Sequence, residues 1–203
     1  TDPAVATAVA DDAYGPDRWN ILTQTASIQI QRNAGDVSAH EAVFNQNQVA
    51  AQRYGILQIV EGVDSIPWRS RPLQFTISII PSATATMRYA ILGWTGTIDA
   101  VTSDVVNDWT SSNYTAGGFF LGANLEIIGI GSQVCTTAGH VTLSVQGTPS
   151  SSINNLMVFL WTESAAAQNF NFDVEQARLG YPISPLWTPR PIAEELVLCQ
   201  RYY

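Results

Sequence analysis

The chain has 203 residues, of which 46% are hydrophobic, and its formal net charge is −8. This length supports one well-buried core and is short for two, so we expect a single domain. The nine basic residues are all arginines and form no cluster, which argues against a nucleic-acid partner because phosphate neutralisation supplies most of that affinity. No apolar run reaches the roughly 18 residues that a membrane span requires, so we expect no membrane partner.

Residues 1–13 are small or acidic and show no hydrophobic period, and we interpret them as an N-terminal arm or linker. Asp11, Asp12 and Asp17 lie close together before the first expected strand. Such a group of oxygen ligands could hold a calcium ion, whereas the alternative is an acidic arm in solvent. We therefore assign no metal ligands and no cofactor.

From residue 14 onward, runs rich in β-branched and aromatic residues alternate with turn-forming segments. In the run from Leu73 to Ile80, apolar and polar residues alternate as they do in a half-buried antiparallel strand. Nine such runs are the expected strands: 18–22, 25–31, 52–61, 73–80, 86–95, 125–130, 140–145, 156–162 and 170–177. This number of strands without long helices predicts an all-β antiparallel sandwich over residues 14–190.

Two segments have a helical period. Residues 98–109 carry Val101, Val105 and Trp109 at a spacing of four, which indicates a short helix in an insert between strands. Residues 191–203 begin with Pro191, which suits a first helical position. The apolar stripe of this C-terminal helix would pack on the sandwich or on a neighbouring subunit, and it consists of Ile192, Leu196, Cys199 and Tyr203.

Catalytic patterns are missing from the sequence. In the run from Phe170 to Gln176, the alternation places Asp173 and Glu175 on the outer face, and we interpret them as a solvated strand face rather than a catalytic acid pair. His40 and His140 lie in no recognised catalytic or metal-binding motif. We therefore expect a protein that is not an enzyme.

Two cysteines are too few and too far apart in the sequence for a disulfide framework or a metal cluster. We expect Cys135 and Cys199 to be buried, unpaired thiols.

Aromatic residues in polar loops suggest a binding role, because sugars stack their C–H faces on Trp and Tyr while their hydroxyls bond to polar groups. The alternative for each of these aromatics is the core or a subunit interface. The candidate glycan-binding residues are Trp68, Arg69 and Arg71 in one loop and Asp108, Trp109, Asn113 and Tyr114 in another.

The end of the chain carries a specific pattern. The run Glu194–Tyr203 reads EELVLCQRYY, and it follows Gln176, Gly180, Ser184–Pro185 and Arg190; near the start, Asp17–Arg18–Trp19 reads DRW. These motifs resemble those of tail fibre and tailspike proteins of tailed bacteriophages. Arg178 and Leu186–Trp187 depart from that pattern, in which Glu and Phe-Glu are common.

The resemblance implies a jelly roll like a carbohydrate-binding module, carried on a virion appendage and often assembled as a homotrimer. Its expected partners are further copies of itself, other virion proteins and a host-surface glycan, and its expected location is the virion. Two alternatives remain open. One is a capsid decoration or head-fibre protein without a ligand, and the other is a carbohydrate-binding module of a secreted enzyme.

Overall fold

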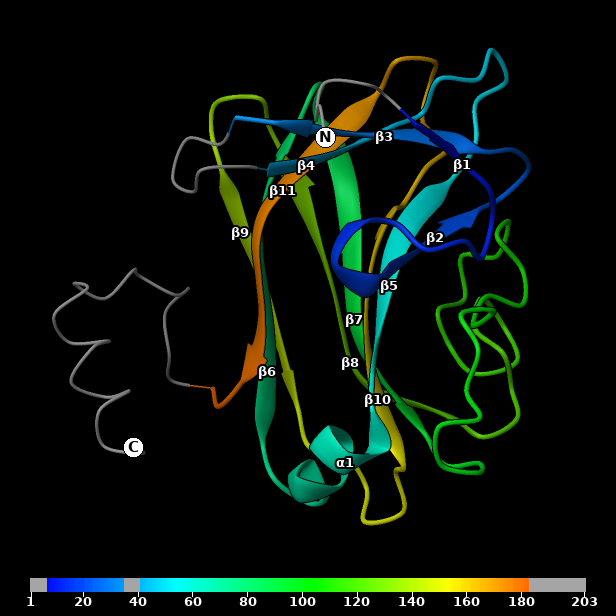
Figure 1. Ribbon diagram of the computed structural model, residues 1–203, viewed down its shortest axis with the longest axis vertical. Coiled ribbons are helices and arrows are strands. Elements are labelled where there is room, and N and C mark those ends of the chain that lie inside the picture. Colours follow the sequence, from blue (N-terminus) through cyan, green and yellow to red (C-terminus); the bar gives the residue numbers. More distant parts are fainter. Residues whose placement is uncertain (1–6, 35–40, 183–203) are drawn as a thin grey trace, which may run out of the picture.

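The computed structural model describes residues 7–34 and 41–182. Eleven strands account for about half of this part of the chain (Figure 1). Their bounds are β1 Thr7–Val9, β2 Trp19–Thr23, β3 Ile28–Asn33, β4 Glu41–Asn45, β5 Tyr54–Val60, β6 Leu73–Pro81, β7 Ala85–Trp94, β8 Leu125–Cys135, β9 Val141–Gly147, β10 Asn155–Thr162 and β11 Asn171–Gly180. The helical elements are the turns η1 Pro16–Arg18 and η2 Ile66–Trp68 and the helix α1 Gly62–Ser65.

The strands form two antiparallel sheets packed face to face. The first sheet has the order β1-β3-β4-β11-β6-β9 and the second has the order β2-β5-β10-β7-β8. Several strands that are neighbours in a sheet are distant in the sequence, as β4 and β11 show by pairing Phe44 with Phe172. The prediction of an all-β antiparallel jelly-roll sandwich is confirmed.

The core between the sheets follows from the alternation of side chains along each strand. In β6, Leu73, Phe75, Ile77 and Ile79 are fully or almost fully buried, and each is part of this core. Tyr54 of the opposite sheet stacks on Phe172 with ring centroids 5.3 Å apart. Its hydroxyl donates a hydrogen bond to the carbonyl of Phe44 at 2.9 Å, so the two sheets are joined by polar as well as apolar contacts.

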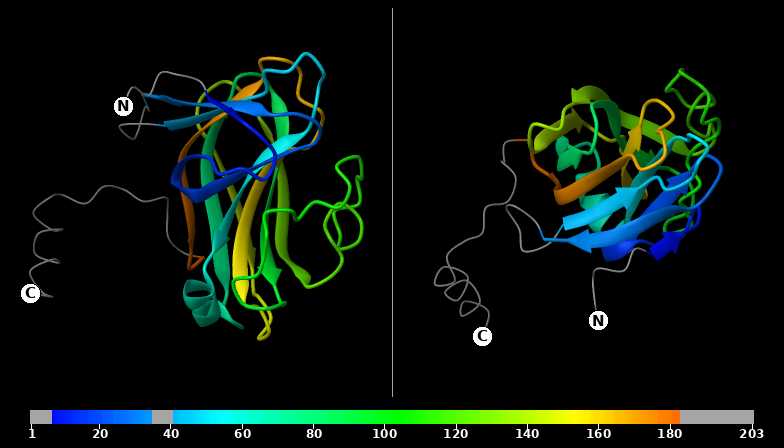
Figure 2. Two further views of the ribbon diagram at one scale, coloured as in Figure 1. Left: turned by 45° about the vertical axis from the view of Figure 1, so that its right-hand side comes forward. Right: turned by 90° about the horizontal axis from the view of Figure 1, so that it is seen from above.

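A second core lies on the outer face of the five-stranded sheet, beneath the insert between β7 and β8. Every residue of β10 is buried, because Leu156, Val158 and Leu160 face the first core while Met157, Phe159 and Trp161 face the second. Figure 2 shows residues 95–124 lying outside the sheet as a separate layer of loops. The sandwich therefore has a third layer along this face.

The prediction of a helix over residues 98–109 is wrong. Asp99 has a left-handed backbone (φ 56°), and the following chain bonds to a later segment of the insert rather than to itself. The backbone amide of Asn107 donates to Phe119 at 2.8 Å and that of Leu121 donates to Val105 at 3.0 Å. Val105 is buried, and Val101 and Trp109 pack on the second core, so the apolar spacing reflects one shared surface reached by an irregular chain.

The six-stranded sheet bends at β11. A register shift between Val174 and Gln176 marks a β-bulge, and the pairing of β11 with β4 ends at Val174. Bulges bend the strand that carries them. In Figure 1, β1, β3 and β4 run across the view, whereas β6, β7 and β10 run along its long axis. This bend opens the sandwich on the side of β2 and β5.

All nine expected strands are present, although their ends differ by up to five residues. Two short strands were missed, β1 and β4. β1 lies within the expected arm of residues 1–13 and pairs with β3, matching Thr7 with Ile30. Asp11 of that arm is also held, since the backbone amide of Thr23 donates to its carboxylate at 2.6 Å. The C-terminal helix and its stripe of Ile192, Leu196, Cys199 and Tyr203 lie outside the described residues, as does His40.

Within the described ranges, the helices are too short to cross a membrane. Cys135 is a free and buried thiol, and burial raises its pKa.

Candidate functional site

The open side of the sandwich holds a cleft of about 620 Å³, which we call the main cleft. Its walls come from β1, β3, β4 and β11 of one sheet and from β2 and β5 of the other, together with the β1–β2 connection. This volume lies within the range of about 300–1,000 Å³ that is typical of ligand sites. The cleft exists because the bent six-stranded sheet no longer covers the β2 edge of its partner.

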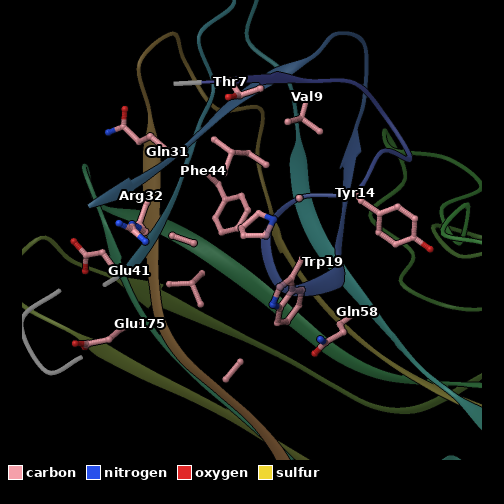
Figure 3. A pocket seen from close by; sticks show the side chains of 16 residues that line it. Thr7, Val9, Tyr14, Trp19, Gln31, Arg32, Glu41, Phe44, Gln58 and Glu175 are labelled. Atoms are coloured by element: carbon pink, nitrogen blue, oxygen red, sulfur yellow. The ribbon is translucent and has the colours of Figure 1, made fainter. Parts of the chain in front are cut away.

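Apolar core side chains form the floor of the main cleft. Trp19, Ile30 and Phe44 belong to the core between the sheets, yet each also borders the cleft. In Figure 3, Trp19 and Phe44 lie in the middle of the site, with Glu41 and Glu175 on one side and Tyr14 on the other. An apolar floor, of which Trp19 is 8% and Phe44 1% exposed, is therefore flanked by polar groups on two sides.

The rim supplies groups that bond to hydroxyls. The residues Gln31, Arg32, Glu41 and Gln58 border the main cleft with a carboxamide, a guanidinium or a carboxylate. Each of these groups is planar and can engage two neighbouring oxygens at once. They come from three different strands, β3, β4 and β5, so only the folded sandwich brings them together.

A ridge made of Tyr14 and Gly15 closes one end of the main cleft. Gly15 presses on the core, because a Cβ at this position would lie 3.1 Å from the side chain of Ile30 and 3.3 Å from that of Ile21. Tyr14 pairs with Asn20 in an isolated β-bridge, yet it is 73% exposed. An aromatic ring is thus held in solvent by a backbone anchored on both sides.

The alternation predicted that Asp173 and Glu175 lie on a solvated strand face, and this prediction is wrong. The Glu175 side chain is only 2% exposed, and its Oε2 lies 3.2 Å from Nε2 of His140, whose Nδ1 is 3.4 Å from the Ser78 hydroxyl. Glu175 sits at the bulge of β11, where the two-residue alternation breaks down. A local pattern could not predict that break.

Asp173 is half-buried beside Glu41. Burial, followed by the charge of Glu41 and a hydrogen bond with it, raises the pKa of Asp173 to about 7. Near pH 7 the Asp173 carboxyl is therefore about half protonated. Since Glu41 lines the main cleft, the protonation of its neighbour Asp173 affects the charge beside the rim.

The predicted glycan-binding residues fall into two separate groups. Trp68, Arg69 and Arg71 lie at the end of the sandwich that carries α1 (Figure 1). Trp68 packs against the core and against Tyr181 at 4.9 Å. Arg69 donates to the carbonyl of Ile153 at 2.7 Å and to the amide oxygen of Asn154 at 2.6 Å, so it ties two loops together. Arg71 is exposed.

The second predicted group lies on the insert. Trp109 and Tyr114 both pack edge-on or tilted against Phe119, at 5.6 and 5.2 Å, and so they cover the second core. Arg88 stacks on the Tyr114 ring at 3.7 Å. The Asp108 carboxylate accepts hydrogen bonds from the amide and hydroxyl of Thr110, and Asn113 is exposed. None of the seven predicted residues lines the main cleft.

The acidic group near the N-terminus serves the fold. The Asp11 carboxylate caps the amide of Thr23, and the Asp12 carboxylate accepts from the Ser103 hydroxyl at 2.8 Å. Among the described residues, no cluster of three or more His, Cys, Asp or Glu side chains is arranged to hold a metal ion.

No protein-family model matches the sequence, and no curated protein matches it either. Solved structures do share the fold. The CBM22-1 xylan-binding domain of Paenibacillus barcinonensis Xyn10C superposes with a TM-score of 0.51 at 9% identity, covering 94% of this chain and 99% of that domain. The C-terminal family 22 carbohydrate binding module of Clostridium thermocellum Xyn10B gives 0.50 at 11% identity, covering 88% of this chain and 94% of that one.

A viral protein has the same architecture. The enzymatically active domain of tailspike protein 4 from bacteriophage CBA120 gives a TM-score of 0.51 at 9% identity, covering 81% of this chain and 19% of the tailspike chain. At such low identities the likeness establishes a shared jelly-roll fold alone. The fold is therefore one that both carbohydrate-binding modules and a tailspike domain use.

Proposed function

We propose that this protein is a carbohydrate-binding jelly roll and that the main cleft is its binding site. The observation that carries the proposal is the cleft itself, in which the core rings of Trp19 and Phe44 form a floor between the planar polar groups of Arg32, Glu41 and Gln58. A sugar ring has the complementary surface, with apolar C–H faces and hydroxyl edges. The structural likeness to carbohydrate-binding modules supports this assignment.

Exposed arginines allow a matched test. Arg32 and Arg71 are both exposed, but only Arg32 borders the main cleft, whereas Arg71 belongs to the loop predicted from sequence. The protein would be screened on an array of neutral and acidic glycans, and the best ligand would then be titrated by calorimetry. We expect Arg32→Ala to weaken binding roughly tenfold, about 1.4 kcal/mol, and Arg71→Ala to leave the affinity unchanged.

Two results would contradict the proposal. Absence of any glycan ligand would reject carbohydrate binding, and loss of binding in Arg71→Ala but not in Arg32→Ala would move the site to the α1 end. We also propose that the protein binds without turnover. Release of reducing sugar from the bound glycan, abolished by Glu41→Gln, would reject that part.

A virion appendage is the second candidate context. It is favoured by the terminal run Glu194–Tyr203, which resembles tail fibre proteins, and by the likeness to the tailspike domain. A module of a secreted carbohydrate-active enzyme is favoured by the more numerous likenesses to family 22 carbohydrate-binding modules. Immunogold labelling with an antibody against the chain separates the two. Labelled particle appendages support the first context, and label confined to a secreted enzyme supports the second.

A further inference from the structure

A second hollow lies beyond the Tyr14–Gly15 ridge, and we call it the second cleft. Tyr14 and Gly15 line both clefts, so the ridge is a wall that the two share. The second cleft is bounded further by Arg18, Glu61, Asp99 and Asn155, and its volume is about 750 Å³. The β1–β2 connection that carries the ridge crosses the open side of the sandwich in Figure 1.

The two clefts lie on opposite faces of the edge of the five-stranded sheet. On β2, Trp19 lines the main cleft and its neighbour Asn20 lines the second one. On β5, Gln58 lines the main cleft and Ile59 lines the second one. Successive residues of a strand point to opposite faces, so one short edge strand and its neighbour present side chains to both sites.

Hydrogen bonds within the chain hold the wall of the second cleft in place. The Asp99 carboxylate accepts hydrogen bonds from the Gly62 amide and from the Asn155 side chain, each at 2.7 Å. These bonds, the Asn155 bond first, hold the pKa of Asp99 below its usual range, so this exposed acid is ionised at neutral pH. In the same cleft, Arg18 pairs with Glu61 at 3.1 Å, and Glu61 directly precedes Gly62.

We propose that the two clefts and the ridge form one continuous binding track for an extended, neutral glycan chain of several sugar units, with Tyr14 as the stacking platform at its middle. This inference rests on the proposed function, because it assigns the ligand class of the same site. A single terminal sugar would occupy only part of the main cleft and would not cross the Tyr14–Gly15 ridge into the second one. An exposed ring that is shared by two polar clefts fits a ligand that passes from one to the other.

The charge of the residues that line the two clefts favours an uncharged glycan. The charged residues that line the two clefts are two arginines, Arg18 and Arg32, against four acids, Glu41, Glu61, Asp99 and Glu175, a net formal charge of −2. The whole chain carries −8. Glycans rich in uronic acids or phosphates would be repelled from such a track, whereas hydroxyls can accept from the arginines and donate to the acids.

Chain length provides the test. Xylose-, glucose-, galactose- and mannose-based oligosaccharides of two, four and six units would be titrated by calorimetry, with hexameric oligogalacturonate as the acidic probe. We expect at least one neutral series to bind, with the six-unit member about tenfold or more tighter than the two-unit member. The oligogalacturonate is expected to bind at least tenfold more weakly than that hexamer.

Tyr14 variants locate the track. Tyr14→Ala is expected to lower the affinity for the hexamer about 3- to 10-fold and to change that for the dimer less than twofold, while Tyr14→Phe retains both. Tyr181→Ala is the matched control, since Tyr181 is 55% exposed and lies outside both clefts. Glu61→Ala in the second cleft should weaken only the hexamer, and Asp64→Ala on α1 should weaken neither.

The outcomes separate this inference from the proposed function. Binding that is independent of length, or a Tyr14→Ala loss that is equal for dimer and hexamer, would overturn the extended track and leave the main cleft standing. Tighter binding of oligogalacturonate would overturn the neutral class. Failure of every glycan to bind would overturn the proposed function and this inference together.

Discussion

Asp173 shows how a single residue can be misassigned by a strand pattern. The alternation in β11 places it on the outer face, and its carboxyl does sit there beside Glu41, but it is half-buried rather than solvated. Desolvation of a carboxylate disfavours its charged form, and a second carboxylate alongside adds to the effect. This position thus decreases the stability of the folded protein whenever Asp173 is ionised.

The raised pKa of Asp173 predicts a pH-dependent stability. Its folded pKa is about 7 and its ordinary value is 3.8, so between these values the folded state retains a proton that the unfolded chain releases. The free energy of unfolding should therefore fall as the pH rises from about 4 to 7 and then level off. Because the group is half-exposed, we expect its contribution to be only about 1–2 kcal/mol.

The substitution Asp173→Asn removes this titration. We expect the variant to be more stable than the parent by roughly 1 kcal/mol at pH 8 and to have a flatter stability profile between pH 5 and 8. Urea denaturation at pH 5, 6.5 and 8 measures both quantities. Asp64→Asn, at an exposed position on α1, is the control and should keep the parental slope. Parental and Asp173→Asn profiles of equal slope would show that Asp173 does not titrate in this range.

At the scale of elements, the insert between β7 and β8 covers the outer face of the five-stranded sheet with packed aromatic rings. The ring of Phe119 stacks on Trp161 with centroids 5.2 Å apart and an interplanar angle of 16°, and it contacts Phe120 edge-on at 5.0 Å. Phe119 is fully buried. The insert is therefore a packed layer of the domain, and its residues Asp99 and Val101 line the second cleft.

Phe119→Ala tests that role. Truncation of a fully buried aromatic ring removes its contacts and leaves a cavity, so we expect a loss of about 3–5 kcal/mol in the free energy of unfolding. Chemical denaturation measures the loss, and the exposed Asn113→Ala in the same insert should change stability by less than about 0.5 kcal/mol. A cost below about 1 kcal/mol for Phe119→Ala would mean that the insert is only loosely attached.

The strands were predictable from the sequence because their signal is local. Alternation within β6 or an apolar run such as β10 needs no knowledge of the partner strand. The two strands that were missed, β1 and β4, are only three and five residues long, which is too short to show a clear alternation. Their assignment depends on pairing with β3, which lies elsewhere in the chain.

The site could not be predicted in the same way, since its residues are distant in sequence. Trp19 and Glu175 meet at one cleft because β11 bulges and the first sheet bends, and neither event leaves a periodic signal. The polar residues next to Trp109 and Tyr114 in the sequence indicated that both rings are exposed to solvent. The stronger signal was the continuous apolar run of β10, because a strand without polar alternation is covered on both faces, and the insert is that second cover.

At the scale of the whole molecule, the order of the strands places the binding surface and the compact layers on different sides. β7, β8 and β9 close one end of the sandwich, where the two sheets contact each other, while β2 and β5 border the open end. The insert covers the outer face of one sheet. Under the proposed function, the edge strand β2 is thus the place where a ligand would reach core aromatic side chains without unfolding any layer.

The composition of the chain leads to a prediction about assembly. Only 13% of the residues are charged, so large areas of surface can be buried against a neighbour without stranding ions in a dry interface. The C-terminal residues Ile192, Leu196, Cys199 and Tyr203, which lie outside the described part of the structure, would form an apolar stripe if helical. Proteins of the tail fibre type, which this terminus resembles, often assemble about a threefold axis.

We therefore predict a homotrimer that the C-terminal segment stabilises. Light scattering of the chain at micromolar concentration should give a mass about three times the 22.0 kDa of one subunit. Leu196→Asp places a charge in the stripe and should shift the mass to that of the monomer, while Asp64→Asn should leave it unchanged. A parental mass near 22.0 kDa would reject the assembly. A trimer that survives Leu196→Asp would instead assign its contacts to the weakly charged faces of the sandwich.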